Sequence, residues 1–419
     1  MDKNTNNITL LYTNENPFCD KNRNIFHWKT KKQSYSIVHK YYEIIINMPI
    51  LITWILLIIY WILAVFSVST YESFHITLLQ WDPSNYFYFF RHLRNIVIAI
   101  VMALAVYKIP VDFFKKQKNI LIITIATFIL QLMVFIPHIW AEYNWARWWI
   151  DIPHLPSIQP CEFFKLWYVL FMAWWLIRKK KEINDDNQLF ISFLVINAIF
   201  LAIFCFIPDF GSALVVWASV LVMWIYSGLN RKKILLTLWI WAGCVFVFGS
   251  IAASVSTKFA YLQERIMYFV WGWDADSSQS IWWQNEQALA AIWWGWFIWN
   301  WYWKGLQKFG YIPEAQSDFI FAAFSEEVWF IWDIVLIALY FFLMYYVLTK
   351  LKWVHDDYWK LIAVWLLSLI ILQAFINIWV NLKILPNTWL TLPFISHGWS
   401  ALMANCMSLM LIYKIIENK

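Results

Sequence analysis

Apolar runs of about eighteen residues or more recur along this chain, and each can cross the ~30 Å hydrocarbon core of a bilayer. Within that core every backbone N–H and C=O needs a partner in the protein, so such runs fold as helices. The chain of 419 residues is 62% hydrophobic and 14% charged, whereas soluble domains carry about 25% charged residues. We therefore predict an all-α polytopic membrane protein.

The apolar pattern predicts about ten transmembrane helices. They are expected at 50–68, 95–108 (with a start as early as Phe87), 119–137, 162–178, 188–206, 212–228, 234–254, 319–348, 360–380 and 395–414. This pattern divides the chain into an N-terminal tail (1–48), a transmembrane domain (49–414) and a short C-terminus (415–419).

Lysine and arginine gather in alternate loops, as in RKKK at 178–181 and RKK at 231–233. Basic residues mark cytoplasmic loops, so both termini are expected in the cytoplasm, beneath the plasma membrane. The net charge of +6 then reflects topology and not nucleic-acid binding. Two of the opposite loops are long, 138–161 and 255–318. Loops longer than about 12–15 residues are usually functional, so the chemistry is expected on the outer face.

Polar residues concentrate in four stretches on or beside that outer face. They are Arg147, Asp151, Gln159, Glu162 and Lys165 in 146–166; Asp209 in 207–214; Glu264, Arg265, Asp274 and Asp276 in 263–287; and Glu314, Asp318, Glu326 and Glu327 in 311–327. For Glu264, Asp274 and Asp276, a solvated loop charge explains the residue as well as a function does.

Three of these carboxylates stand where a transmembrane helix is predicted. Asp318 directly precedes the apolar FIFAAF, and Glu326 and Glu327 follow about two turns inside the same predicted helix. An ionisable group at membrane depth is costly and marks a pathway or a site. Glu162 and Lys165 are three residues apart on one helix face, so a structural ion pair explains them at least as well as catalysis.

No metal, nucleotide or hydrolase motif is present, because the chain lacks HExxH, GxSxG, a Walker loop and a Rossmann fingerprint. Its five cysteines are scattered without a CxxC, which predicts neither a disulfide framework nor a metal site. His397 lies at the mouth of the last predicted span. A lone histidine of this kind is more often a packed residue than a ligand.

A carboxylate-bearing outer loop over a helical bundle suits an anionic, lipid-linked substrate whose head group reacts outside the bilayer. Asp318, partly desolvated, could act as a general base towards a sugar hydroxyl. Arg147, Lys165 and Arg265 could hold a diphosphate, which suits cationic donors. The residues alone leave a transferase and a transporter equally open.

Four segments carry a resemblance to a known family. LPSIQPCEFFKL (155–166) resembles its Q-P-S-E-x-x-K segment, and PDFGSALV (208–215) its Q-P-D-x-G-T-A segment. KFGYIPEAQSDFIFAAFSEEV (308–328) resembles its L-P-E-A-H-T-D-F-I-F-A…E-E signature, and the stretch 376–405 its C-terminal signature. On these motifs the chain is similar to the SEDS family (FtsW/RodA), polytopic proteins of bacterial cell-wall synthesis.

The resemblance implies a SEDS-type bundle and a peptidoglycan glycosyltransferase that polymerises lipid II outside the membrane. QKFGYIPEAQSDFIFA and LTLPFIS are closer to the division branch (FtsW) than to the elongation branch (RodA), which predicts septal synthesis during cell division. A lipid II flippase, a non-catalytic division scaffold and a RodA-like elongation polymerase are the alternatives.

The resemblance also assigns roles to residues. Asp318 matches the family's catalytic aspartate, and a divalent cation (Mg²⁺ or Mn²⁺) could share the charge of the diphosphate. Supporting or substrate-binding roles are expected for Arg147, Gln159, Glu162, Lys165, Asp209, Arg265, Glu314, Glu326 and Ser396. The implied partners are a class B penicillin-binding protein, other division proteins and membrane lipid.

Tryptophan and glycine occur in unusual proportions, with 33 tryptophans and 9 glycines where average usage of about 7% would give roughly 29 glycines. Many tryptophans stand where the family has glycine. These are Trp145, Trp148, Trp282, Trp293, Trp296, Trp299, Trp301, Trp303, Trp329, Trp332, Trp379, Trp389 and Trp399. We interpret them as UGA codons that the source bacterium reads as glycine and that are translated here as tryptophan.

The nucleotide sequence of the gene tests this interpretation directly. We expect UGA at the tryptophan positions 293, 296, 299, 301 and 303. UGG at those positions would support the alternative, a true aromatic belt of the kind that tryptophan forms at membrane interfaces. A belt explains Trp54, Trp61, Trp217 and Trp241 poorly, since they lie inside predicted spans.

Overall fold

Long apolar helices make up most of the described chain in this computed structural model. The residues that it describes are 47–79, 82–136, 140–143, 146–150, 157–179, 182–206, 209–241, 243, 281–297, 301–313 and 315–418. The predicted N-terminal tail (apart from residues 47 and 48), the second half of the predicted seventh span and residues 255–280 of the predicted outer loop lie outside the described residues. Pro49–Lys419 forms one unit of the chain and is described by itself.

Most of the predicted spans coincide with helices. Their bounds are Asn47–Val68 (the first span), α2 Thr70–Leu78, α3 Phe87–Lys108, α4 Gln117–Leu132, α5 Pro160–Lys179, α6 Asn187–Phe206, α7 Phe210–Ser227, α10 Ile281–Phe297, α11 Ile320–Ser325, α12 Phe330–Leu351, α13 Asp357–Asn381 and α14 Trp399–Glu417, with 3₁₀ turns η1 Val111–Lys115 and η2 Met133–Phe135. Eight described helices are long and apolar enough to span a membrane, and Gly211–Ser227 is a shorter apolar helix. The all-α, multi-pass fold is confirmed, while the count of ten stays a prediction.

Helix ends follow local chemistry. α5 begins at Pro160, where the missing N–H of proline costs nothing. α7 begins after Asp209, whose carboxylate accepts from the Ser212 N–H at 2.9 Å, and it ends at Gly228 with φ 78°. These are the N-cap and the left-handed C-terminal residue expected of a stable helix.

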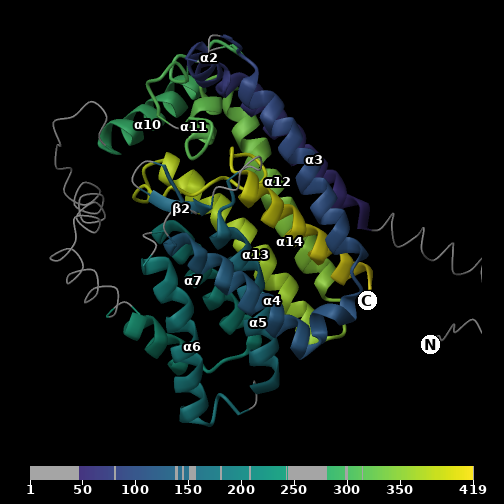
Figure 1. The fold of residues 1–419 in the computed structure, drawn as a ribbon. Coiled ribbons are helices and arrows are strands. Elements are labelled where there is room, and N and C mark those ends of the chain that lie inside the picture. The colour runs from purple at the N-terminus through teal and green to yellow at the C-terminus, as the bar shows by residue number, and fades with distance from the viewer. Residues whose placement is uncertain are drawn as a thin grey trace, which may run out of the picture. The chain divides into compact units, whose positions relative to one another are not determined.

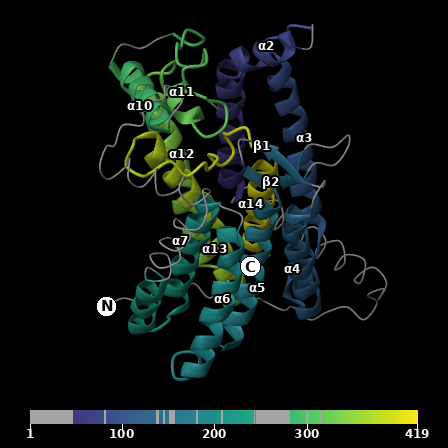
Figure 2. The same cartoon turned by 60° about the vertical axis from the view of Figure 1, so that its left-hand side comes forward.

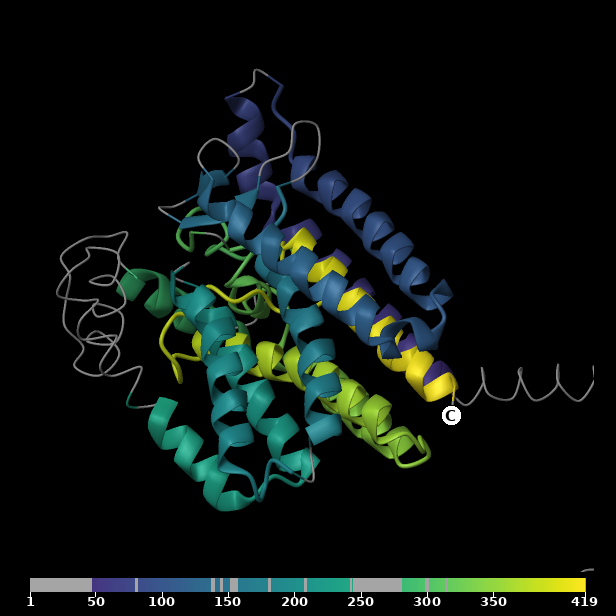
Figure 3. The same ribbon diagram turned by 60° about the horizontal axis from the view of Figure 1, so that its bottom comes forward.

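α13 and α14 lie at the centre of the Pro49–Lys419 unit (Figure 1). In the most apolar 18-residue stretch of each helix, 83% of the residues of α13 and 94% of those of α14 are buried, compared with 28% in α12 and 29% in α6. α3 runs alongside α14, and α5 and α7 pack on α13 (Figures 1 and 3). α2, α10 and α11 gather at one end of the unit (Figure 2), the end that the charge pattern predicts to face outwards.

The predicted span 319–348 is not one helix, and this prediction is corrected. α11 stops at Ser325 and α12 starts at Phe330 after an extended Trp329 with φ −62° and ψ 153°. Glu326 and Glu327 therefore lie at the junction of two helices and not two turns inside one. The physical reason is that both carboxylates accept hydrogen bonds from a loop about twenty residues earlier in the chain.

Regular structure also appears where loops were predicted. The strands β1 (Trp140–Tyr143) and β2 (Ala146–Ile150) form an antiparallel hairpin, and Ile158 pairs with Ile150 beside it. α10 lies within the stretch predicted as the long outer loop. It packs on α11 so closely that a Cβ on Gly295 would lie 1.9 Å from the Ser325 carbonyl oxygen, which makes glycine necessary there.

Two tryptophans adopt backbone conformations that suit glycine. Among the described residues, positive φ without glycine occurs only at Trp303 (77°), Lys383 (57°), Trp389 (51°) and Phe394 (66°). A bulky residue at positive φ is an outlier, because Cβ then crowds the following carbonyl. Both tryptophans stand at positions where the family resemblance places glycine, which supports the UGA interpretation.

Paired substitutions separate this backbone strain from the loss of the indole ring. At Trp389 we expect Trp389→Gly to be more stable than Trp389→Ala by about 1 kcal/mol, since glycine adopts that φ without the steric cost of a Cβ. Trp294 lies in helical α10 and is half exposed. There the order reverses, because glycine costs about 1 kcal/mol relative to alanine inside a helix. Thermal unfolding in detergent measures both differences, and the same order at both positions would contradict the glycine interpretation.

Candidate functional site

Asp318 lies on the loop that leads into α11, with its backbone tied to α13. Its carbonyl oxygen accepts from Asn377 Nδ2 at 2.9 Å and from Asn381 Nδ2 at 3.0 Å. Ser317 Oγ donates to Asp318 Oδ1 at 3.0 Å, and the Asp318 residue is half-buried. Two side chains of α13 thus hold the main chain of Asp318 through one carbonyl, while the residue as a whole stays partly exposed.

The segment before α14 packs against the same loop. The His397 N–H donates to the Gln316 carbonyl at 2.9 Å, two residues before Asp318. Ser396 is buried, and its Oγ accepts from the Leu392 N–H at 2.6 Å. In this structure Ser396 therefore shapes its own turn beside the Asp318 loop.

His397 is a packed residue, as its isolation in the sequence suggested. Its ring meets that of His92 edge-on, with centroids 3.9 Å apart. Burial, followed by the charge of Arg91, lowers the pKa of His397 to about 3. The imidazole is therefore neutral at pH 7.

A second polar cluster joins α5 to the start of α7. Lys165 Nζ lies 2.8 Å from Glu162 Oε1 and 3.5 Å from Ser212 Oγ, and Cys161 Sγ donates to Asp209 Oδ2 at 3.4 Å. The side chains of Glu162 and Lys165 are only 6% and 4% exposed. The structure thus brings together three of the predicted site residues as a buried ion pair beside a helix cap.

The loop before α14 connects this cluster with the Asp318 loop. Asn377 Nδ2 donates to the Leu390 carbonyl at 2.6 Å as well as to Asp318. A Cβ on Gly211, at the start of α7, would lie 2.3 Å from the Thr388 carbonyl oxygen. Gln159 adds a further tie, since its N–H donates to Ser400 Oγ at 3.0 Å.

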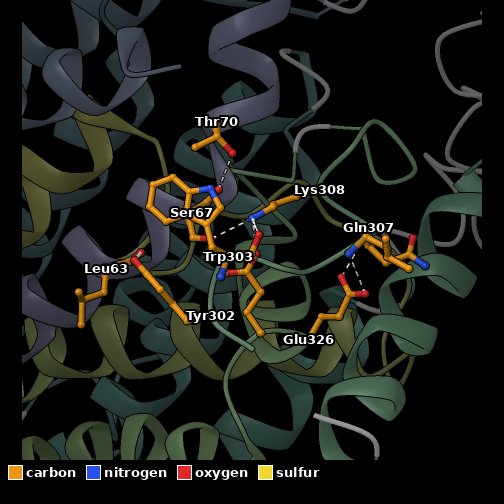
Figure 4. A network of polar contacts seen from close by, with 10 residues as sticks. Leu63, Ser67, Thr70, Tyr302, Trp303, Gln307, Lys308 and Glu326 are labelled. Carbon is orange, nitrogen blue, oxygen red and sulfur yellow. Dashed lines mark hydrogen bonds and ion pairs between the residues drawn. The ribbon is translucent and has the colours of Figure 1, made fainter. Parts of the chain in front are cut away.

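Glu326 makes a third polar group at the α11–α12 junction. Its Oε1 accepts from the Leu306 N–H and its Oε2 from the Gln307 N–H, both at 3.0 Å. Figure 4 shows these contacts beside Lys308 and Ser67. Because its carboxylate is occupied by main chain, Glu326 holds a loop in place in this structure.

The side chains of three predicted site residues lie outside what the structure describes. Arg265 and Glu314 lie outside the described residues, and only the backbone of Arg147 is described, in β2. Among the described residues no group of three or more His, Cys, Asp or Glu could hold a metal ion.

Asn377 and Asn381 are functional candidates that the sequence reasoning missed. They stand four residues apart in a mostly apolar helix, so their side chains lie on the same face of that helix. That spacing was the available signal. Lys308 was also missed, because its place in a predicted loop suggests an exposed charge. The structure instead buries its side chain completely.

The comparisons with known proteins identify a family. A model of the FtsW/RodA/SpoVE family, described as cell cycle protein, matches residues 47–419. Among curated proteins, the chain is 28% identical over 369 residues to the probable peptidoglycan glycosyltransferase FtsW of Burkholderia thailandensis, covering 83% of this chain and 72% of that protein.

Two solved structures share the fold. One chain of a peptidoglycan synthase complex that coordinates polymerization and crosslinking superposes with a TM-score of 0.63 at 22% identity, over 79% of this chain and 89% of that one. The rod shape determining protein RodA of Thermus thermophilus gives a TM-score of 0.58 at 18% identity, over 88% of this chain and 96% of that one. Since the family model covers nearly the whole chain, this protein belongs to the FtsW/RodA/SpoVE family of cell cycle proteins.

Proposed function

We propose that this protein is a peptidoglycan glycosyltransferase that polymerises lipid II at the outer face of the membrane, with Asp318 as its general base. The observation that carries the proposal is that Asp318 is a half-buried acidic residue whose backbone carbonyl accepts from two asparagines of α13. The name of the Burkholderia relative supports the activity.

The reaction needs one proton acceptor and a place for a leaving diphosphate. The acceptor sugar's 4-hydroxyl attacks the donor's anomeric carbon, a C–O bond forms, and the bond to the lipid diphosphate breaks. The hydroxyl proton passes to the Asp318 carboxylate, which is general base catalysis. The fixed carbonyl of Asp318 keeps that carboxylate near one orientation, which is what positioning contributes.

On this proposal, Arg147 and Arg265 bind the diphosphate. Guanidinium groups suit bidentate phosphate contacts. Lys165 is a weaker candidate, because its ammonium is buried and already donates to Glu162 and Ser212. Glu162, Lys165 and Asp209 instead fix the start of α7, against which the segment around Thr388 packs.

The proposed setting is the plasma membrane at the division septum, with both termini in the cytoplasm. The motif comparison favours the division branch, and a class B penicillin-binding protein is the expected partner that cross-links the strands. The solved synthase complex that shares the fold, which couples polymerization with crosslinking, supports a partner of this kind.

The Asp318→Asn variant tests the enzyme directly. Loss of the base should lower the rate of glycan polymer formation from lipid II by about 10²–10⁴-fold, measured with the full-length protein purified together with its class B transpeptidase. Asp356→Asn is the matched control. That carboxylate caps α13 and pairs with Lys115 at an exposed position, so its rate should stay near that of the wild type.

Two other outcomes point to the rival functions. If Asp318→Asn still forms polymer but no longer moves lipid II across proteoliposomes, the protein is a flippase. If a strain depleted of the wild-type protein grows normally on Asp318→Asn present at wild-type abundance, the protein acts as a scaffold.

Asn381→Ala tests whether the hydrogen bonds to the Asp318 carbonyl contribute to catalysis. It removes one of two donors, a contact worth about 0.5–1.5 kcal/mol, and the expected result is a fall in kcat of about 2- to 10-fold at unchanged KM for lipid II. A rise in KM with kcat unchanged would show that Asn381 serves substrate binding.

A further inference from the structure

Lys308 and Glu327 form a completely buried ion pair that the proposed reaction does not use. Lys308 Nζ and Glu327 Oε1 are 2.6 Å apart, and both side chains are 0% exposed. Lys308 also donates to Ser67 Oγ at 3.1 Å and to the Trp303 carbonyl at 2.9 Å. All three ammonium protons therefore have an acceptor (Figure 4).

Glu327 is equally satisfied. Its Oε2 accepts from the Trp303 N–H at 3.1 Å and from the hydroxyl of Ser67. A buried ion pair seldom adds net stability over an apolar pair, because desolvation offsets the attraction. Because every polar atom of the pair has a partner, we infer that the pair serves to fix the positions of the segments that it joins.

The loop around the pair is built to approach it closely. A Cβ on Gly305 would lie 2.8 Å from Glu327 Cγ and 3.0 Å from Glu326 Oε2, so a larger residue here would displace these carboxylates. Tyr302 Oη donates to the Leu63 carbonyl at 2.9 Å. Burial, followed by the charge of Glu327, raises the pKa of Tyr302 to about 12, so the phenol keeps its proton at pH 7.

The pair closes a loop that contains Asp318. Lys308 and Glu327 stand 19 positions apart, and Asp318 lies near the middle of that interval. Ser67 belongs to the first span, so the contact ties both ends of the loop to a helix far away in sequence. The Asp318 segment is thereby held at its ends by Lys308, Glu327 and Ser67, and at its centre by α13.

We propose that Lys308, Glu327 and Ser67 form a positioning unit that fixes the orientation of Asp318 for proton transfer, which rests on the proposed glycosyltransferase function. None of the three needs to touch substrate. Releasing them moves the catalytic carboxylate without removing it. A misplacement of about 1 Å can cost about 10²-fold in rate.

The Lys308→Met/Glu327→Met double variant tests the proposal without leaving a buried charge unpaired. We expect kcat for lipid II polymerisation to fall by about 10- to 100-fold, with KM unchanged because substrate contacts remain. Amide hydrogen exchange across residues 309–319 should quicken in the same variant. Unchanged kcat and unchanged exchange together would mean that the pair only fills space, and would overturn the proposal.

Ser67 supplies a conservative rescue. Ser67→Ala removes the hydroxyl and should lower kcat, whereas Ser67→Thr keeps it and should restore most of the rate; equal rates for the two would exclude a role for the hydroxyl. Lys179→Met is the matched control, because Lys179 pairs with Glu182 at an exposed site, and it should leave kcat unchanged.

Failure of the proposed function gives a different result. If the wild-type protein forms no polymer under any condition, the glycosyltransferase assignment fails. The exchange measurement then still reports whether the Lys308–Glu327 pair orders the Asp318 loop.

Discussion

Two carboxylates at a break between apolar helices organise the end of the molecule that carries Asp318. The loop that joins α10 to α11 lies beside this break, and its free backbone N–H groups need hydrogen-bond acceptors. Glu326 and Glu327 provide them, since together they accept from the main-chain N–H groups of Trp303, Leu306 and Gln307. The loop, the junction and the approach to Asp318 therefore form one hydrogen-bonded structure.

The helices were predictable because apolar runs report directly on burial in lipid or protein. The break at Glu326 was not, since the run from Ile320 to Leu351 gives no sign that its carboxylates would bind a loop some twenty positions earlier. The same limit applies to the site. Asp318 was identified from its motif, but the contact of Asn377 and Asn381 with its carbonyl depends on how α13 rotates in the bundle, which hydropathy does not encode.

α13 packs against both parts of the candidate site, the Asp318 loop and the polar cluster of α5 and α7. It is among the most deeply buried helices, and it contacts α5 and α7 as well as α14. Asn377 binds the Asp318 loop and the Leu390 carbonyl at once, while Gly211 of α7 lies against the neighbouring Thr388. The Glu162–Lys165 pair and Asp318 are therefore set relative to one helix, although they come from distant parts of the sequence.

The buried Lys308–Glu327 pair also constrains how the protein is assembled in its membrane. Neither group can stay charged in an apolar environment alone without a large desolvation penalty, so each stabilises the charged form of the other. Their shared partner Ser67 is made early in translation, on the first span, and the pair itself much later. This contact therefore cannot form until residues from both the beginning and the second half of the chain have been translated.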